Sequence, residues 1–177
     1  HFLVIPFIPT YLEFNKGFSK DQIPLILLCG GVASFVSAIY LGRFSDKKGK
    51  LPVFIWSVLL SLFLVLILTD MPDMHLIMAL AFFAVLFMVV TARIVVAQAM
   101  ISEVVTQEQR GSFMSVNGSV QQMGQAVASL VAGLIIYSDK STHQLYNYNW
   151  VGYLSILILI ICMLAARSIF KQIDRSS

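Results

Sequence analysis

The chain has 177 residues, of which 58% are hydrophobic and 12% charged, and its formal net charge is +3. This hydrophobic share, together with a mean hydropathy of +0.84, excludes a soluble globular domain. The positive charge is concentrated in short links between apolar runs, where it indicates membrane topology and excludes nucleic-acid binding.

Six transmembrane helices are expected, because a helix needs about 20 apolar residues to cross about 30 Å of hydrocarbon. The expected spans cover about residues 1–14, 23–43, 51–69, 75–102, 111–137 and 146–168. The first span begins inside an apolar run and has no initiator Met, so we expect residues 1–177 to be one half-domain of a longer protein, with its first helix truncated. The fold class predicted from the sequence is an all-α membrane protein.

Small residues recur at four-residue spacing in the second span, at Gly30 and Ser34. This spacing places both on one face of a helix, where small side chains let a neighbouring helix approach closely. We therefore predict that these two residues are helix-packing positions. Cys29 lies in the same apolar run and Cys162 in the last one, so both are interpreted as small hydrophobic residues and not as a disulfide or a metal site.

The link between the second and third spans reads LGRFSDKKGKLP and contains four cations, one carboxylate and two glycines. Glycine permits a tight turn, and a carboxylate can contact a helix N-terminus or a nearby Arg. Such a contact can form in one arrangement of two helices and break in another, which would make this link a gating loop. Its candidate residues are Gly42, Asp46, Lys47, Gly49 and Lys50.

Lys and Arg in short links stay on the cytoplasmic side of a membrane. With the expected spans, one face carries eight of these residues and the other face three. We therefore expect the gating loop and the C-terminal tail to lie in the cytoplasm, most simply at the plasma membrane.

Arg93 is a charged residue within the fourth span. One interpretation is that its long side chain snorkels to the cytoplasmic headgroups. The other is a gate or coupling group that faces the bundle interior. Glu103 follows ten residues later and lies on a different side of the helix, so we expect the partner of Arg93 elsewhere, for example in a missing half.

Asn117, Gln121 and Gln125 form a polar stripe along the fifth span. Amides in hydrocarbon need hydrogen-bond partners, so the stripe either bonds a facing helix or lines a wet substrate cavity. Gly124 and Ala128 lie in the same span and are predicted to be helix-packing positions.

The gating loop has the pattern G-x-x-x-D-K-x-G-K. It resembles G-x-L-A-D-R-x-G-R-(K/R), the loop signature between the second and third helices of each half of the major facilitator superfamily. Three positions depart from this signature: Phe44, Ser45 and Leu51. The resemblance implies half of a twelve-helix major facilitator fold, in which two six-helix bundles surround a cavity whose ends open in turn.

Residues 93–136 resemble the fourth and fifth helices of the drug:proton antiporter branch of that superfamily. Arg93 matches the Arg of R-x-x-Q-G, and Gly124 and Gly133 match two glycines of G-x-x-x-G-P-x-x-G-G. The replaced positions are Val96, Ala97, Ala128, Ser129 and Ala132. This loss of signature residues and the basic tail favour the C-terminal half of a transporter of roughly twice this length.

The resemblance implies a secondary active transporter that moves a small molecule by alternating access, through proton-coupled efflux. The expected partners are the lipid bilayer, a missing N-terminal six-helix half, a small-molecule substrate and protons, with no cofactor, metal or nucleic acid. His and acidic residues occur only at the ends of the expected spans and none lies at membrane depth, so we do not expect an enzyme, and a proton-titrating residue would have to come from the missing half. The alternative is a half-sized membrane scaffold without transport activity.

Overall fold

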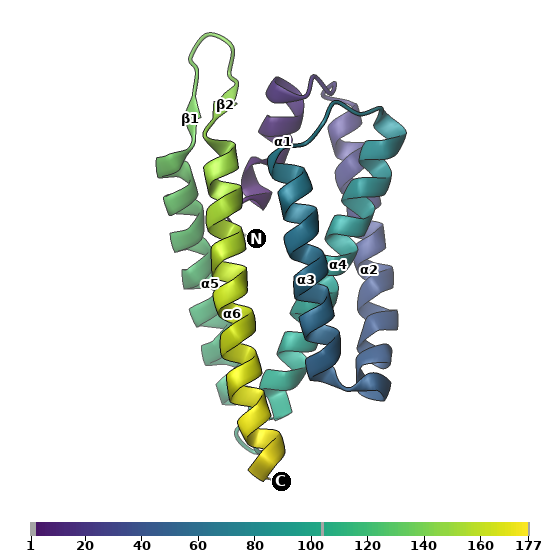
Figure 1. Cartoon of the computed structure of the whole chain (residues 1–177), viewed down its shortest axis with the longest axis vertical. Coiled ribbons are helices and arrows are strands. Elements are labelled where there is room, and N and C mark those ends of the chain that lie inside the picture. Colours follow the sequence, from purple (N-terminus) through teal and green to yellow (C-terminus); the bar gives the residue numbers. More distant parts are fainter. Residues whose placement is uncertain (1–2, 104, 177) are drawn as a thin grey trace.

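Helices make up most of the chain, as its apolar runs require (Figure 1). This computed structural model describes residues 3–103 and 105–176, and side chains up to residue 169. The helices and strands are α1 (Ile8–Thr10), α2 (Gln22–Lys48), α3 (Lys50–Thr69), α4 (Leu76–Glu103), α5 (Arg110–Ile135), β1 (Tyr137–Ser138), β2 (Leu145–Tyr146) and α6 (Tyr148–Ser176).

Four of the described helices are long and apolar enough to cross a membrane: α2, α3, α4 and residues 148–169 of α6. The fifth expected span differs from these four. α5 has 26 residues and is therefore about 39 Å long, which is sufficient to cross a bilayer. Its glutamines, serines and glycines make it less apolar than the other four, so α5 requires a polar environment along one side.

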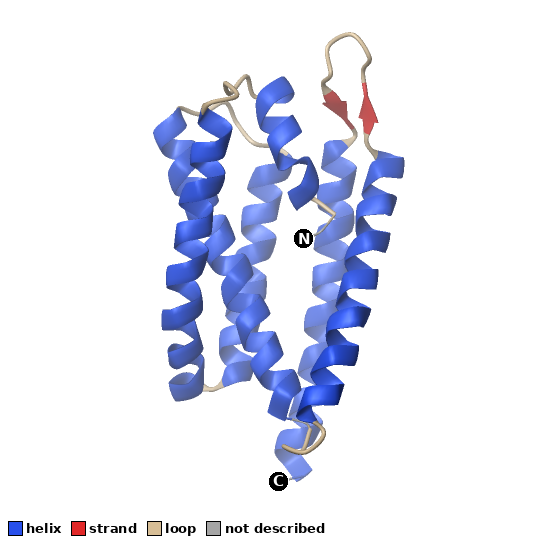
Figure 2. Cartoon of the chain, turned by 180° about the vertical axis from the view of Figure 1, so that it is seen from behind, coloured by secondary structure: helices blue, strands red, loops and turns tan. Residues whose placement is uncertain are grey.

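The long helices run side by side, with α2, α3 and α4 in one group and α5 and α6 in the other (Figures 1 and 2). α2 packs along α4, and α3 contacts both α4 and α6. A Cβ placed on Gly30 would lie only 2.6 Å from Cδ2 of Phe87 in α4, and the hydroxyl of Ser34 donates to the carbonyl of Phe87 at 3.3 Å. α5 lies beside α6 and exposes most of its remaining surface.

The first expected span is an irregular helical segment that contains two prolines. It starts with a 3-10 turn at Ile5–Phe7, continues through α1 and ends as a π turn at Tyr11–Asn15. Proline removes a backbone donor and prevents regular hydrogen bonding one turn earlier, which accounts for the change of helix type near Pro6 and Pro9.

A short hairpin of β1 and β2 joins α5 to α6, a feature that the sequence analysis did not predict. The side chain of Asn15 holds this hairpin, because its Nδ2 donates to the carbonyl of Leu145 and its Oδ1 accepts from the N–H of Leu145, both at 2.9 Å. Tyr11 stacks on Tyr148, with ring centroids 4.3 Å apart. The first helical segment is thus attached to the loop region that precedes α6.

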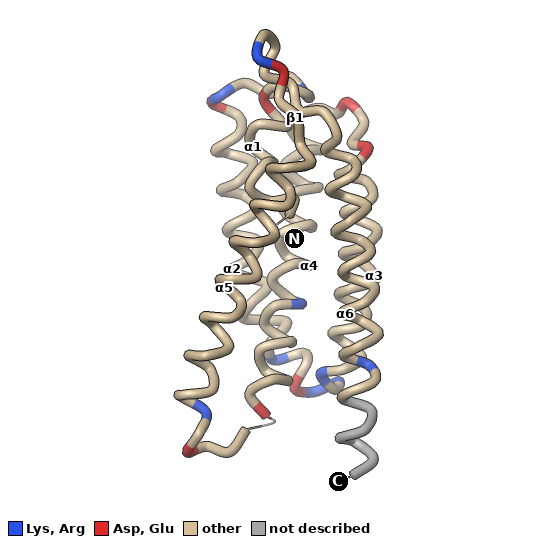
Figure 3. Tube along the Cα trace, turned by 90° about the vertical axis from the view of Figure 1, so that its left-hand side faces the viewer, with Lys and Arg blue, Asp and Glu red and all other residues tan. Residues whose placement is uncertain are grey.

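The connection between α2 and α3 is shorter than the expected link. The expected second span ends at residue 43, but α2 continues through Lys48 and α3 begins at Lys50. Gly49 makes the turn with φ 91° and ψ 138°, a conformation that glycine adopts far more readily than other residues. We call this end of the bundle the Gly49 end and the opposite end the hairpin end. Charged residues gather at these two ends (Figure 3).

Candidate functional site

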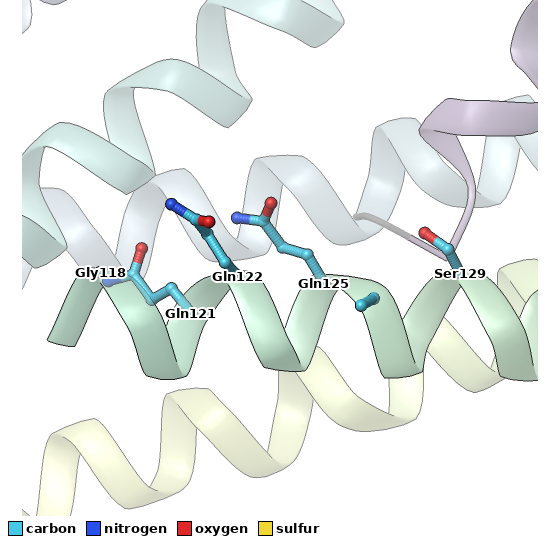
Figure 4. A pocket seen from close by; sticks show the side chains of 6 residues that line it. Gly118, Gln121, Gln122, Gln125 and Ser129 are labelled. Carbon is cyan, nitrogen blue, oxygen red and sulfur yellow. The ribbon is translucent and has the colours of Figure 1, made fainter. Parts of the chain in front are cut away.

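A polar groove follows α5 on the side away from α6 (Figure 4). The groove is open, has a volume of about 630 Å³, and is lined by Gly118, Gln121, Gln122, Gln125, Ala126 and Ser129. Gln122 is exposed, whereas Gln121 and Gln125 are half-buried. Since an amide loses free energy in hydrocarbon without a partner, this face is suited to a wet cavity or to another polar surface.

The predicted polar stripe faces the rest of the bundle at its Asn117 end. Asn117 Nδ2 donates to Oε1 of Gln98 in α4 at 3.3 Å. Gln121, one turn further along α5, lines both the open groove and a second cavity between the helices. The stripe thus contains one interhelical hydrogen bond and residues that line cavities, and the lining of a substrate cavity stays a prediction.

Arg93 lines this second cavity, which has a volume of about 390 Å³ and lies between α3, α4, α5 and α6. Gln98, Gln121 and Cys162 also line it, and Phe54 and Val58 contribute apolar walls. The Nη1 of Arg93 is buried and has no hydrogen-bond partner among the described residues. Snorkelling would expose this nitrogen, but Arg93 as a whole is half-buried, and its role as a gate or coupling group stays a prediction.

The gating-loop residues lie at the end of α2 and the start of α3. Lys50 Nζ lies 3.8 Å from Asp46 Oδ1 and forms a second ion pair with Oε1 of Glu103, the last residue of α4. Lys50 thereby connects the ends of α2 and α4. Lys47 is exposed, and Gly42 is half-buried in the last turns of α2. The gating role of these residues stays a prediction.

The two predicted packing positions of α2 and those of α5 have different surroundings. Gly30 and Ser34 contact Phe87, as described above. In α5, Ala128 packs beside the main hydrophobic core, whereas a Cβ on Gly124 would meet nothing within 4 Å. No described residue packs closely at Gly124, so its role as a helix-packing position stays a prediction.

Sequence reasoning missed Gln98, which bonds to the stripe and lines the cavity of Arg93. An amide within a long apolar run is the signal that could have identified it. It also missed a network at the hairpin end, where Lys16 pairs with Asp73 at 3.3 Å and the Tyr153 hydroxyl donates to Asp70 at 3.3 Å. Both carboxylates lie in the short link after α3, where an isolated sequence gives no sign of their partners.

In the exposed hairpin, the pKa of one acidic residue, Asp139, is shifted. The backbone N–H and the hydroxyl of Ser141 both donate to Asp139 Oδ1, at 2.8 and 2.7 Å. These bonds stabilise the carboxylate and lower the pKa of Asp139 below its ordinary value. The charged turn shapes the hairpin tip and is separate from the cavities.

Comparison with known proteins gives one result that covers nearly the whole chain. The family model described as Major Facilitator Superfamily matches residues 1–176. No curated protein and no solved structure matches the chain.

Proposed function

This chain belongs to the major facilitator superfamily, and we propose that it is the C-terminal six-helix half of a secondary transporter in the drug:proton antiporter branch. The family match and the four long apolar helices make it an integral membrane protein of the major facilitator type, a class of transporters and not of enzymes. The eroded signatures around Arg93 and Gly124 support the assignment to this half and branch.

The transporter exports a small molecule in exchange for protons by alternating access. The observation that carries this proposal is the open polar face of α5, where glutamine side chains lie along a helix of membrane-spanning length. In a two-bundle carrier, this face would border a water-filled path shared with the other bundle. The excess of Lys and Arg supports a cytoplasmic Gly49 end and C-terminus, and the proposed location is the plasma membrane.

A half-sized scaffold without transport activity is the other function considered. The family match does not favour it, because members of this family are transporters. No contact or surface of the described residues supports it independently.

The complete protein, reconstituted into liposomes, tests the proposal. Vesicles that contain carboxyfluorescein, ethidium or Nile red report transport of an anionic, a cationic and a neutral probe. We expect at least one probe to move faster when a pH gradient is imposed, and we expect a protonophore to remove that acceleration. Transport at the same rate with and without the gradient contradicts proton coupling. Correctly folded protein that moves none of the probes contradicts the proposed drug-export branch.

Replacing Asp46 with Asn is expected to slow transport several-fold while leaving membrane insertion and thermal stability unchanged. The side chain of Asp46 is 66% exposed, and exposed ion pairs contribute only about 0–1 kcal/mol to stability. Lys50 keeps Glu103 as its partner in this variant. The probe flux and the unfolding temperature are measured on the same preparation. An unchanged flux would mean that the loop only sets topology.

A further inference from the structure

Arg93 is the charged residue that lies deepest within the described membrane-spanning helices. It is 17 residues from Leu76 and ten from Glu103, and therefore about 25 Å and 15 Å from the two ends of α4. Arg167 lies nine residues from the end of α6, and the other charged residues of the long helices lie within five residues of a helix end. A guanidinium ion at this depth requires an anionic partner or several hydrogen-bond acceptors, because an unpaired charge is costly in hydrocarbon.

The described residues give Arg93 no anionic partner. Their ion pairs lie at the two ends of the bundle and involve Lys16, Lys20 and Lys50. Glu103, the acidic residue on the same helix, is paired with Lys50. Arg93 lines the cavity, and its buried Nη1 has no hydrogen-bond partner among the described residues.

The other described residues that line the cavity provide hydrogen-bond donors and no carboxylate. Gln98 accepts the hydrogen bond of Asn117 through its Oε1, which leaves its amide NH₂ group to donate elsewhere, and Gln121 supplies a second amide. A guanidinium fork with neutral amide donors is complementary to a planar carboxylate, which can accept two parallel hydrogen bonds. The apolar walls formed by Val58 and Leu159 would accommodate a hydrocarbon portion, and about 390 Å³ is within the range of small-molecule sites.

From these observations we propose that the cavity between α3, α4, α5 and α6 is a binding site for a small organic anion, whose carboxylate pairs with Arg93. The inference rests on the proposed transport function and narrows its substrate to an organic anion. Gln98 and Gln121 donate to the same anion and orient it in the cavity.

Cys162 provides a reporter, because it lines the same cavity. In the complete protein, Cys29 and any cysteine outside residues 1–177 are replaced by Ala, so that Cys162 is the single thiol. Its modification rate is measured with anionic sulfonatoethyl methanethiosulfonate and with cationic trimethylammonioethyl methanethiosulfonate. Each rate is divided by the rate of the same reagent with free 2-mercaptoethanol, which removes the intrinsic difference between the reagents.

We expect the normalised rate to be roughly tenfold higher for the anionic reagent, because a nearby guanidinium attracts one reagent and repels the other. Arg93→Gln should remove this preference, and Arg93→Lys should preserve most of it. Arg110→Gln is the matched control, since Arg110 is exposed at the start of α5 and does not line the cavity. Benzoate should slow the modification of Cys162, whereas the neutral analogue benzamide should not.

Equal normalised rates in the wild type, or a preference that survives Arg93→Gln, would overturn the proposal. Failure of Cys162 to react with both reagents would also overturn it, because ions could not reach the site. Size-exclusion profiles confirm that each variant is folded, and Arg93→Lys keeps the test valid if Arg93→Gln is not. A preference without probe flux would contradict transport and retain the anion site, whereas flux with no preference would contradict only the anion site.

Discussion

Gly152→Ala is expected to lower the unfolding temperature of the protein strongly. A Cβ at position 152 of α6 would lie 2.0 Å from Oγ1 and 3.0 Å from Cβ of Thr69 in α3, well inside van der Waals contact. Thr69 is buried, and its hydroxyl donates to the carbonyl of Val65 at 2.7 Å, so rotating it away would break that bond. Overpacking of this kind typically costs about 1–3 kcal/mol, and a contact this short places the variant toward the upper end.

Gly124→Ala is the matched control for this experiment. Gly124 is also inside a helix, but a Cβ there meets nothing within 4 Å. Because alanine favours a helix by about 1 kcal/mol relative to glycine, this variant should be as stable as the wild type or more stable. Adding Thr69→Ala to Gly152→Ala should recover part of the lost stability, since it removes Oγ1 and Cγ2 of Thr69, the two atoms closest to the added Cβ. Thermal unfolding in one detergent measures all four proteins, and a wild-type unfolding temperature for Gly152→Ala would disprove the close contact of α3 and α6.

The membrane class and the positions of the long helices could be predicted because they depend on local composition. A run of about 20 apolar residues has few alternatives to a helix, and the four apolar helices follow these runs closely. Helix ends were less predictable. α2 extends to Lys48 because polar residues can continue a helix beyond the apolar core, and the turn occurs at Gly49, a residue that readily adopts the required φ of 91°.

The contacts between distant segments could not be predicted from local pattern. The Asn15 amide binds the backbone of Leu145, which is 130 positions away, and Gly152 approaches Thr69 across two helices. Neither pairing has a periodic signal, since each depends on how the helices are placed. The stripe of Asn117, Gln121 and Gln125 was visible because its spacing matches the helical repeat, but only the structure reveals Gln98 opposite it.

Lys50→Glu is expected to reduce transport roughly tenfold, because it places a third carboxylate between Asp46 and Glu103, where the wild type has a cation. Repulsion would separate the start of α3 from the end of α4, two points that a gate at this end must bring together. Thermal stability should change little, since both carboxylate partners are more than half exposed, with side-chain exposures of 66% and 60%. A large loss of flux with a small change in unfolding temperature would therefore indicate a role in gating.

Exchanging the charges tests whether the contact itself is responsible. Glu103→Lys alone should also impair transport, whereas Lys50→Glu with Glu103→Lys should restore much of it, because the ion pair is rebuilt in reverse. Lys16→Glu is the control at the hairpin end, where Lys16 pairs with the 96% exposed Asp73, and we expect a smaller loss of flux there. If the double exchange remains as slow as Lys50→Glu, then transport requires a positive charge at position 50 and not the ion pair with position 103. In that case the pattern D-K-x-G-K would act through the sign of its charge and not through the contact between α3 and α4.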